Sequence, residues 1–196
     1  MSGLTQQPIA PGSRVAASDA TLQLRVRQLA GLLGKNEHRL SVAESCTGGW
    51  LAKVLTDRAG SSAWFLGGYV VYSNAAKQRD GKVLARTLAR DGAVSEATVR
   101  QLALTCLAQF GSEWSVAISG IAGPTGATVG KPVGTVWMAI GRAKGAPRRG
   151  SHAPTRGPAL REITTFWCQL RGSREHIRRQ SVALALTKLI ELIQSD

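Results

Sequence analysis

Residues 40–55 read LSVAESCTGGWLAKVL, the pattern of a strand, a turn and a helix. The apolar run at its start is typical of a buried strand, and the pattern from Trp50 onward is typical of a helix. The small polar turn 45–49 joins the two, as in layered α/β proteins. A turn that opens a helix places Ser45 and Thr47 beside unpaired backbone N–H groups, which favour anions and oxyanions. We therefore expect the chemistry of this protein at the turn.

Helices and strands alternate along the rest of the chain. Helices are expected after Ser18-Asp19 as far as Gly34, over 47–58, from a cap at Asn74, over 96–110 after a cap at Ser95, and after a cap at Ser173. Strands are expected over 39–44, 67–72, 114–119, 133–140 and 163–170. This order predicts a single-domain layered α/β sandwich, with a mixed, mostly parallel sheet and helices on both faces. We expect residues 1–18 to form a flexible N-terminal tail and residues 19–196 to form the domain.

Composition predicts a cytoplasmic protein with one core. The 196 residues, 43% of them hydrophobic, suffice for one compact α/β domain. The N-terminal stretch lacks the apolar block of a signal peptide, and no later segment approaches the roughly 20 apolar residues of a membrane-spanning helix. The three cysteines, Cys46, Cys106 and Cys168, are widely spaced, which suits reduced thiols.

The chain is strongly basic, with a net charge of +13 and a pI near 10.8. This charge implies attraction to anionic partners, whether phosphate metabolites, nucleic acid or acidic membrane surfaces. Many of the arginines lie over 142–161, in a Gly/Pro-rich stretch that is typical of an exposed connection between strands. Because no aromatic residues interleave with these arginines, the pattern favours a solvated loop over a nucleic-acid surface.

Four motifs occur in order along the chain: AESCTGG at 43–49, GSSAWF at 60–65, YSNAAK at 72–77, and SGIAGP at 119–124 with KPVGTV at 131–136. Together they closely resemble the CinA C-terminal domain family, and GAVSE at 92–96 and RRQ at 178–180 extend the resemblance to nearly everything from about residue 20 onward. Members are known as nicotinamide-nucleotide amidohydrolases, which cleave nicotinamide mononucleotide to nicotinate mononucleotide and ammonia. The resemblance implies this reaction and the stand-alone form of the family, without its N-terminal pyrophosphatase domain.

The resemblance assigns catalysis to Ser45, Tyr72 and Lys77. Chemistry supports the assignment independently, because a serine hydroxyl is a weak nucleophile unless a base takes its proton. A lysine can be that base when desolvation or a neighbouring cation lowers its pKa. We expect Lys77 to act through Tyr72. We also expect backbone amides of the turn to hold the tetrahedral oxyanion, at Thr47, Gly48 and Gly49.

Substrate recognition is expected at two further places. The resemblance implies that the second glycine-rich segment lies against the substrate, through Ser119, Gly120 and Gly123, where glycines permit a close backbone approach. It also points to Arg174, whose guanidinium can bind a phosphate through two hydrogen bonds. The family usually has Gly-Asp-Arg at this place, whereas this chain has Ser173 before Arg174.

Structural roles compete with these assignments. Ser45 and Thr47 could simply cap a helix, Tyr72 could end a buried strand, and Lys77 could be solvated on a helix. Cys46 is a rival nucleophile by chemistry alone, although no histidine is locally tied to it.

No cofactor is expected. The spacing of Tyr72 and Lys77 is one residue too long for a short-chain dehydrogenase, and no glycine-rich dinucleotide turn follows an N-terminal strand. The segment 126–132 is one residue short of a phosphate loop and has Pro132 where a metal-binding hydroxyl belongs. The three histidines are scattered. The sequence therefore predicts neither a metal nor a redox cofactor.

Two function classes stay open. The first is the amidohydrolase, acting on a small phosphorylated molecule and forming a homo-oligomer, with no membrane partner. The alternative is a basic binding protein that uses the same scaffold with little or no turnover and contacts nucleic acid. The retained Ser45, Tyr72 and Lys77 favour the enzyme, whereas the net charge of +13 favours the alternative.

Overall fold

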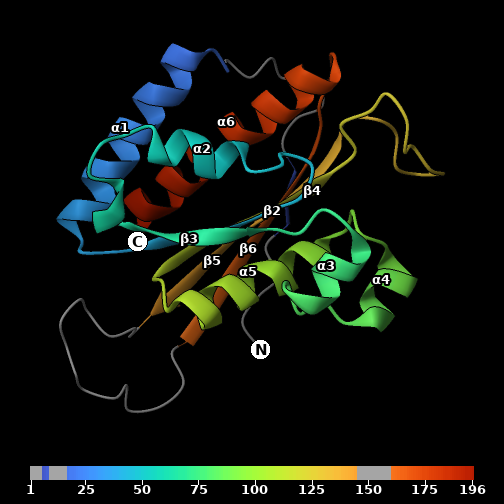
Figure 1. Ribbon diagram of the computed structural model, residues 1–196, viewed down its shortest axis with the longest axis horizontal. Coiled ribbons are helices and arrows are strands. Elements are labelled where there is room, and N and C mark those ends of the chain that lie inside the picture. Colours follow the sequence, from blue (N-terminus) through green and yellow to red (C-terminus); the bar gives the residue numbers. More distant parts are fainter. Residues whose placement is uncertain (1–5, 9–16, 145–159) are drawn as a thin grey trace.

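The computed structural model describes residues 6–8, 17–144 and 160–196 as one α/β sandwich (Figure 1). The strands are β1 (Gln6–Pro8), β2 (Leu40–Glu44), β3 (Phe65–Val70), β4 (Trp114–Gly120), β5 (Thr135–Lys144) and β6 (Leu160–Gln169). The helices are α1 (Asp19–Lys35), α2 (Trp50–Thr56), α3 (Asn74–Arg79), α4 (Ala85–Asp91), α5 (Glu96–Phe110) and α6 (Arg174–Ser195), with a short 3₁₀ helix at Ser61–Ala63. The predicted fold class is confirmed.

The six strands form one mixed sheet in the order β1-β6-β5-β4-β2-β3. Strands β3, β2 and β4 are neighbours and run parallel, whereas β5 is antiparallel to both β4 and β6. The carboxyl ends of β3, β2 and β4 therefore lie at one edge of the sheet, with β2 in the middle. Open α/β sheets bind ligands at such an edge.

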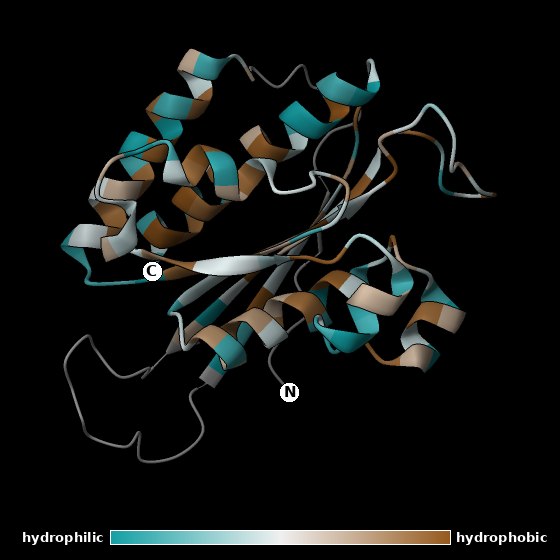
Figure 2. Cartoon of the chain, viewed as in Figure 1, coloured by the Kyte–Doolittle hydropathy of each residue, from teal (hydrophilic) through white to brown (hydrophobic). Residues whose placement is uncertain are grey.

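Helices α1, α2 and α6 cover one face of the sheet, and α3, α4 and α5 cover the other (Figure 1). Hydrophobic and hydrophilic residues alternate along each helix, as expected when one side packs on a sheet (Figure 2). Successive residues of a strand point to opposite faces. In β4, Val116 and Ile118 accordingly join the core under α1 and α6, while Ala117 joins the core under α5. The sheet is thus buried on both sides.

Local signals predicted most helix starts correctly. The hydroxyls of Ser18, Ser95 and Ser173 each accept a hydrogen bond from a backbone N–H three residues later, as N-caps do. The predicted cap of the helix near residue 74 was wrong. Its cap is Ser73, not Asn74, and it ends at Arg79, so that α4 is a separate helix.

The basic segment predicted as a loop is partly sheet. Its ends 142–144 and 160–161 belong to β5 and β6, because the two strands pair over their full length from Thr135 to Lys144. Arg142 is largely buried, pairs with the Asp196 carboxylate at 2.8 Å and lies over the Trp114 ring. The remaining arginines of this segment, Arg148, Arg149 and Arg156, lie outside the described residues.

The N-terminal segment 1–18 contains one short strand, since Gln6–Pro8 pair in parallel with β6. Residues 17 and 18 lead into α1, and the other residues of the predicted tail lie outside the described part of the chain. Among the helices that the structure describes, none has the length and the apolar character needed to cross a membrane.

Candidate active site

The site lies at the carboxyl edge of the three parallel strands. Ser45 directly follows β2, Tyr72 follows β3 by two residues, and Gly123 follows β4 by three. The Ser45 amide donates to the Ile118 carbonyl at 3.0 Å, which fixes the start of the turn against β4. The fold therefore brings together the three motifs that the sequence analysis singled out at 43–49, 72–77 and 119–124.

Lys77 reaches Ser45 directly from α3. The side chain is only 1% exposed, and its Nζ lies 2.9 Å from Ser45 Oγ, 2.8 Å from the Val71 carbonyl and 3.0 Å from the Tyr72 carbonyl. Carbonyl oxygens only accept hydrogen bonds. A neutral Lys77 amine therefore gives its two N–H groups to the carbonyls and keeps its lone pair for the Ser45 hydroxyl. This is the arrangement of a general base.

Burial also changes the acidity of the Lys77 ammonium group. Desolvation disfavours the ammonium form and lowers the pKa of Lys77 from 10.5 to about 8. A base with a pKa near the working pH combines a usable neutral fraction with enough basicity to take a proton. The competing interpretation of Lys77 as a solvated helix residue is therefore wrong.

The expected role of Tyr72 between the two side chains differs from the structure. Tyr72 is 59% exposed, and its hydroxyl accepts a hydrogen bond from Arg174 Nη2 at 3.0 Å. Lys77 donates to the backbone carbonyl of Tyr72, not to the phenol. β3 ends at Val70, and beyond the strand the Tyr72 phenol contacts Arg174 of α6 in place of Lys77.

Glu44 closes the other side of the turn. Its buried carboxylate accepts hydrogen bonds from the amides of Gly49 at 3.0 Å, Leu51 at 3.0 Å and Ala52 at 2.8 Å. These are the orphan N–H groups at the start of α2, which a negative charge stabilises. Glu44 was not among the residues predicted from the sequence, although a glutamate directly before the turn was a visible signal.

The Glu44 contacts change the expected oxyanion site. The Gly49 amide is occupied by Glu44, and the Gly48 amide donates to the Ser45 carbonyl at 3.0 Å. Gly48 and Gly49 instead allow the left-handed backbone conformation of the turn, with φ of +61° and +89°. Among the described residues, the amides of Cys46 and Thr47 donate to no oxygen.

We predict that Glu44→Gln destabilises the fold. A carboxamide presents an N–H group to at least one of the three backbone amides, and a buried unpaired donor costs about 1–3 kcal/mol. The expected loss in the free energy of unfolding is about 2 kcal/mol, measured by urea denaturation. The matched control is Glu191→Gln, since the Glu191 side chain is 52% exposed on α6 and pairs with Lys188. An equal effect of both substitutions would contradict the role assigned to Glu44.

Two arginines of α6 hold the site loops. Arg178 donates from Nε to the Cys46 carbonyl at 3.0 Å and from Nη2 to the Thr47 carbonyl at 2.8 Å. Arg174, one helical turn earlier, donates from Nη1 to the Gly123 carbonyl at 2.7 Å and from Nη2 to the Tyr72 hydroxyl. Arg174 was predicted as a site residue from the sequence, whereas Arg178 was not. The spacing of four residues, which places both arginines on one face of the helix, could have indicated Arg178.

The second glycine-rich segment is used mainly in packing. Ser119 is 1% exposed and donates its hydroxyl to the Ala93 carbonyl at 2.7 Å. A Cβ on Gly120 would lie 2.8 Å from Val136 Cγ2, and one on Gly123 would lie 2.5 Å from Val133 Cγ1. These contacts explain the small residues without a substrate. They stay candidates for substrate binding only through their backbone.

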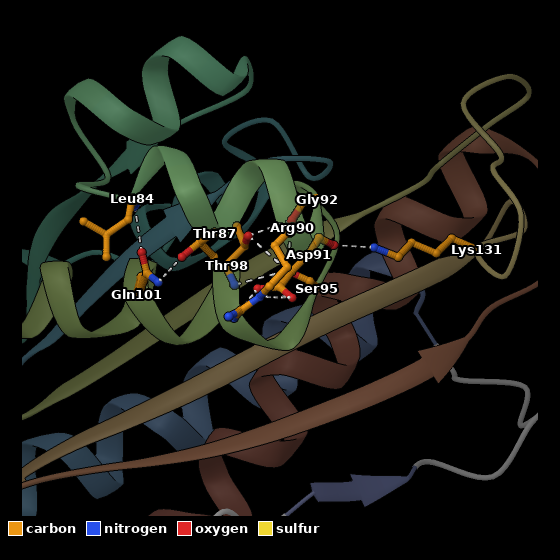
Figure 3. A network of polar contacts seen from close by, with 9 residues as sticks. All are labelled: Leu84, Thr87, Arg90, Asp91, Gly92, Ser95, Thr98, Gln101 and Lys131. Carbon is orange, nitrogen blue, oxygen red and sulfur yellow. Dashed lines mark hydrogen bonds and ion pairs between the residues drawn. The ribbon is translucent and has the colours of Figure 1, made fainter.

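The Ala93 carbonyl, which accepts the hydrogen bond from Ser119, lies in a segment that is fixed by a polar network (Figure 3). The hydroxyls of Ser95 and Thr98 donate to the Gly92 carbonyl at 2.9 and 2.8 Å. Lys131, from the KPVGTV motif, donates to the Asp91 carbonyl at 2.6 Å. This lysine therefore anchors the loop after β4 to the end of α4.

Cys46 is not a competitive nucleophile in this environment. Its thiol is 5% exposed, and desolvation raises its pKa to about 12. The thiolate is the reactive form of cysteine, and almost none is present near neutral pH at such a pKa.

The hydroxyl of Thr47 is buried and has no hydrogen-bond partner among the described residues.

A serine paired with a buried lysine at the carboxyl edge of an α/β sheet defines this protein as a candidate serine–lysine enzyme. A family model described as the CinA C-terminal domain matches residues 23–193, and the chain belongs to this family.

Relatives and solved structures agree with this membership. The nicotinamide-nucleotide amidohydrolase PncC of Escherichia coli (strain K12) is 43% identical over 172 residues, which are 88% of this chain and 94% of the relative. PncC of Pseudomonas putida is 39% identical, covering 85% of this chain and 96% of its own. Among crystal structures, the competence/damage inducible protein CihA from Agrobacterium tumefaciens superposes with a TM-score of 0.73 at 34% identity, covering 92% of this chain and 99% of that one. The CinA superfamily protein from Enterobacter cloacae gives 0.72 at 28% identity, covering 97% and 99%.

Proposed function

We propose that this protein hydrolyses the carboxamide of nicotinamide mononucleotide to nicotinate mononucleotide and ammonia. The observation that carries the proposal is the buried Lys77 amine, whose Nζ contacts two backbone carbonyls and lies 2.9 Å from Ser45 Oγ. This geometry suits acyl transfer from an amide. The choice of substrate rests on the PncC relatives, which match nearly the whole chain at 39% to 43% identity.

In the proposed reaction, Ser45 Oγ attacks the carboxamide carbon while its proton passes to Lys77 Nζ. The tetrahedral oxyanion is stabilised by the backbone amides of Cys46 and Thr47, which directly follow the nucleophile. Lys77 then returns the proton to the leaving nitrogen, so that ammonia departs and an ester on Ser45 remains. Water, deprotonated by Lys77, attacks the ester and releases the carboxylic acid and the free serine.

Arg174 is the residue that we assign to the phosphate of the substrate. Its guanidinium is exposed at the start of α6, where the helix amides also favour an anion. One arm already donates to the Gly123 carbonyl, and this contact orients the guanidinium without the aspartate that the family usually has directly before the arginine. Ser173, which stands at that position here, caps α6 by accepting a hydrogen bond from the His176 amide.

The proposal predicts ammonia release from nicotinamide mononucleotide by the purified full-length chain. Ammonia is measured by a coupled assay and nicotinate mononucleotide by chromatography. Nicotinamide riboside, which lacks the phosphate, is expected to show a higher KM because it forgoes the Arg174 contact. Absence of ammonia release, combined with tight and salt-dependent DNA binding at physiological ionic strength, would instead support the alternative function as a basic binding protein.

A further inference from the structure

Tyr72 and Arg174 form a bridge across the end of β2. Tyr72 follows β3, and Arg174 joins its hydroxyl to the Gly123 carbonyl, which follows β4. In the sheet, β2 lies between β3 and β4, and Ser45 follows β2. The two ends of the bridge are thus anchored on either side of the strand that carries Ser45. Lys77 Nζ contacts both Ser45 Oγ and the Tyr72 carbonyl, so Tyr72 belongs to the same edge of the sheet as the nucleophile.

The Tyr72 ring is available for a ligand. The residue is 59% exposed although its backbone carbonyl contacts the buried Lys77 amine. Within the described residues, the ring–ring and cation–ring contacts involve other aromatic side chains and leave Tyr72 unstacked. The hydrogen bond from Arg174 fixes the ring at its hydroxyl end, so a ligand that stacks on it does not have to order it first.

The substrate of the proposed function has a matching charge. Attachment of the ribose to the ring nitrogen makes nicotinamide a pyridinium cation, whereas the reduced dihydropyridine ring is neutral. A tyrosine face attracts a cation within about 6 Å of the ring centre. An exposed, oriented tyrosine face at the edge of the sheet that carries Ser45 is therefore suited to a flat cationic ring.

We propose that the Tyr72 ring is a binding platform for the pyridinium ring, and that it makes the site prefer the oxidised, charged form of the nucleotide over the reduced, neutral form. This inference rests on the proposed function. It assigns to Tyr72 a specificity-determining contact through its ring face, in place of proton transfer through its hydroxyl.

Binding provides the first test and needs no turnover. In the Ser45→Ala background, calorimetry compares nicotinamide mononucleotide with its reduced form. The charged form is expected to bind about tenfold more tightly, which equals about 1.4 kcal/mol at 25 °C. Adding Tyr72→Leu is expected to remove most of this preference, while adding Tyr72→Phe retains it. A tenfold preference that persists in the Tyr72→Leu protein would overturn the proposal.

Turnover provides the second test. Tyr72→Leu is expected to raise KM about tenfold, and Tyr72→Phe is expected to restore most of that loss because the ring remains. Leu24→Ala is the control for loss of an exposed apolar side chain, since Leu24 is 63% exposed on α1. If Tyr72→Phe lowers kcat as strongly as Tyr72→Leu and alters the pH profile, the hydroxyl takes part in proton transfer and the platform proposal is wrong.

The two tests separate this inference from the proposed function. If the wild-type chain releases no ammonia but binds the charged form through Tyr72, the proposed amidohydrolase function is wrong and the proposed role of the Tyr72 ring is supported. If the wild-type chain releases ammonia but binds both ring forms with equal affinity, the proposed function is supported and the proposed role of the Tyr72 ring is wrong.

Discussion

Ser45→Ala is expected to lower kcat for ammonia release from nicotinamide mononucleotide by about 10⁴-fold or more, as removal of a nucleophile does in other serine hydrolases. The reason is that the oxygen which forms the ester is gone, and neighbouring groups cannot replace it. Cys46, the adjacent side chain, is buried with a pKa of about 12. The measurement is steady-state ammonia release, with nicotinate mononucleotide followed in parallel.

The loss is expected without unfolding. Among the described residues, the hydrogen-bond partner of Ser45 Oγ is Lys77 Nζ, and that amine keeps its two carbonyl partners in the variant. The free energy of unfolding should therefore fall by about 1 kcal/mol or less, as measured in urea. Cys46→Ala serves as the neighbouring control and should retain turnover. A Ser45→Ala protein that still releases ammonia at a substantial rate would remove Ser45 as the nucleophile.

The features of the fold that depend on local chemistry could be predicted from the sequence. Ser18, Ser95 and Ser173 are helix caps because each hydroxyl accepts a hydrogen bond from the backbone N–H three residues later. This contact is local and does not depend on the rest of the fold. The strand–turn–helix at 40–55 was predictable for the same reason, since its hydrophobic pattern and glycines act within a few residues.

The extent of the long strands could not be read from the sequence. Residues 142–144 look like part of a basic loop, yet they pair with β6 across the sheet. Their strand conformation depends on residues about twenty positions away. Arg142 is stabilised there by contacts with Trp114 and Asp196. Both residues are distant in the sequence, so local strand propensity does not indicate these contacts.

The candidate site shows the same division. Ser45 and Lys77 could be named from their motifs, but their direct contact depends on how α3 packs against the end of β2. The expected tyrosine does not lie between them, because the Tyr72 phenol contacts Arg174, a residue about 100 positions away in the sequence. Gly49 was expected to bind the oxyanion, but its amide donates to Glu44, a contact set by how α2 packs on the end of β2.

Lys77→Arg is expected to lower kcat/KM for nicotinamide mononucleotide by about 10³-fold, the loss typical for removal of a general base. An arginine side chain stays protonated at any usable pH and cannot accept the Ser45 proton. Because a guanidinium could disturb the buried site, Lys77→Met is a second variant of similar length without charge. Lys53→Arg is the control, since the Lys53 side chain is 66% exposed on α2. Denaturation in urea shows whether each variant is folded.

The pH profile links the loss to Lys77. In the proposed mechanism the neutral amine is the active form, and burial lowers the pKa of Lys77 to about 8. Wild-type kcat/KM should therefore rise about tenfold per pH unit below about pH 7 and level off above about pH 8. In folded Lys77→Met protein the residual rate should lack this rise, because the titrating base is gone. A folded Lys77→Met protein that keeps the wild-type profile would show that another group is the base, and that the contact between Lys77 and Ser45 has a structural role.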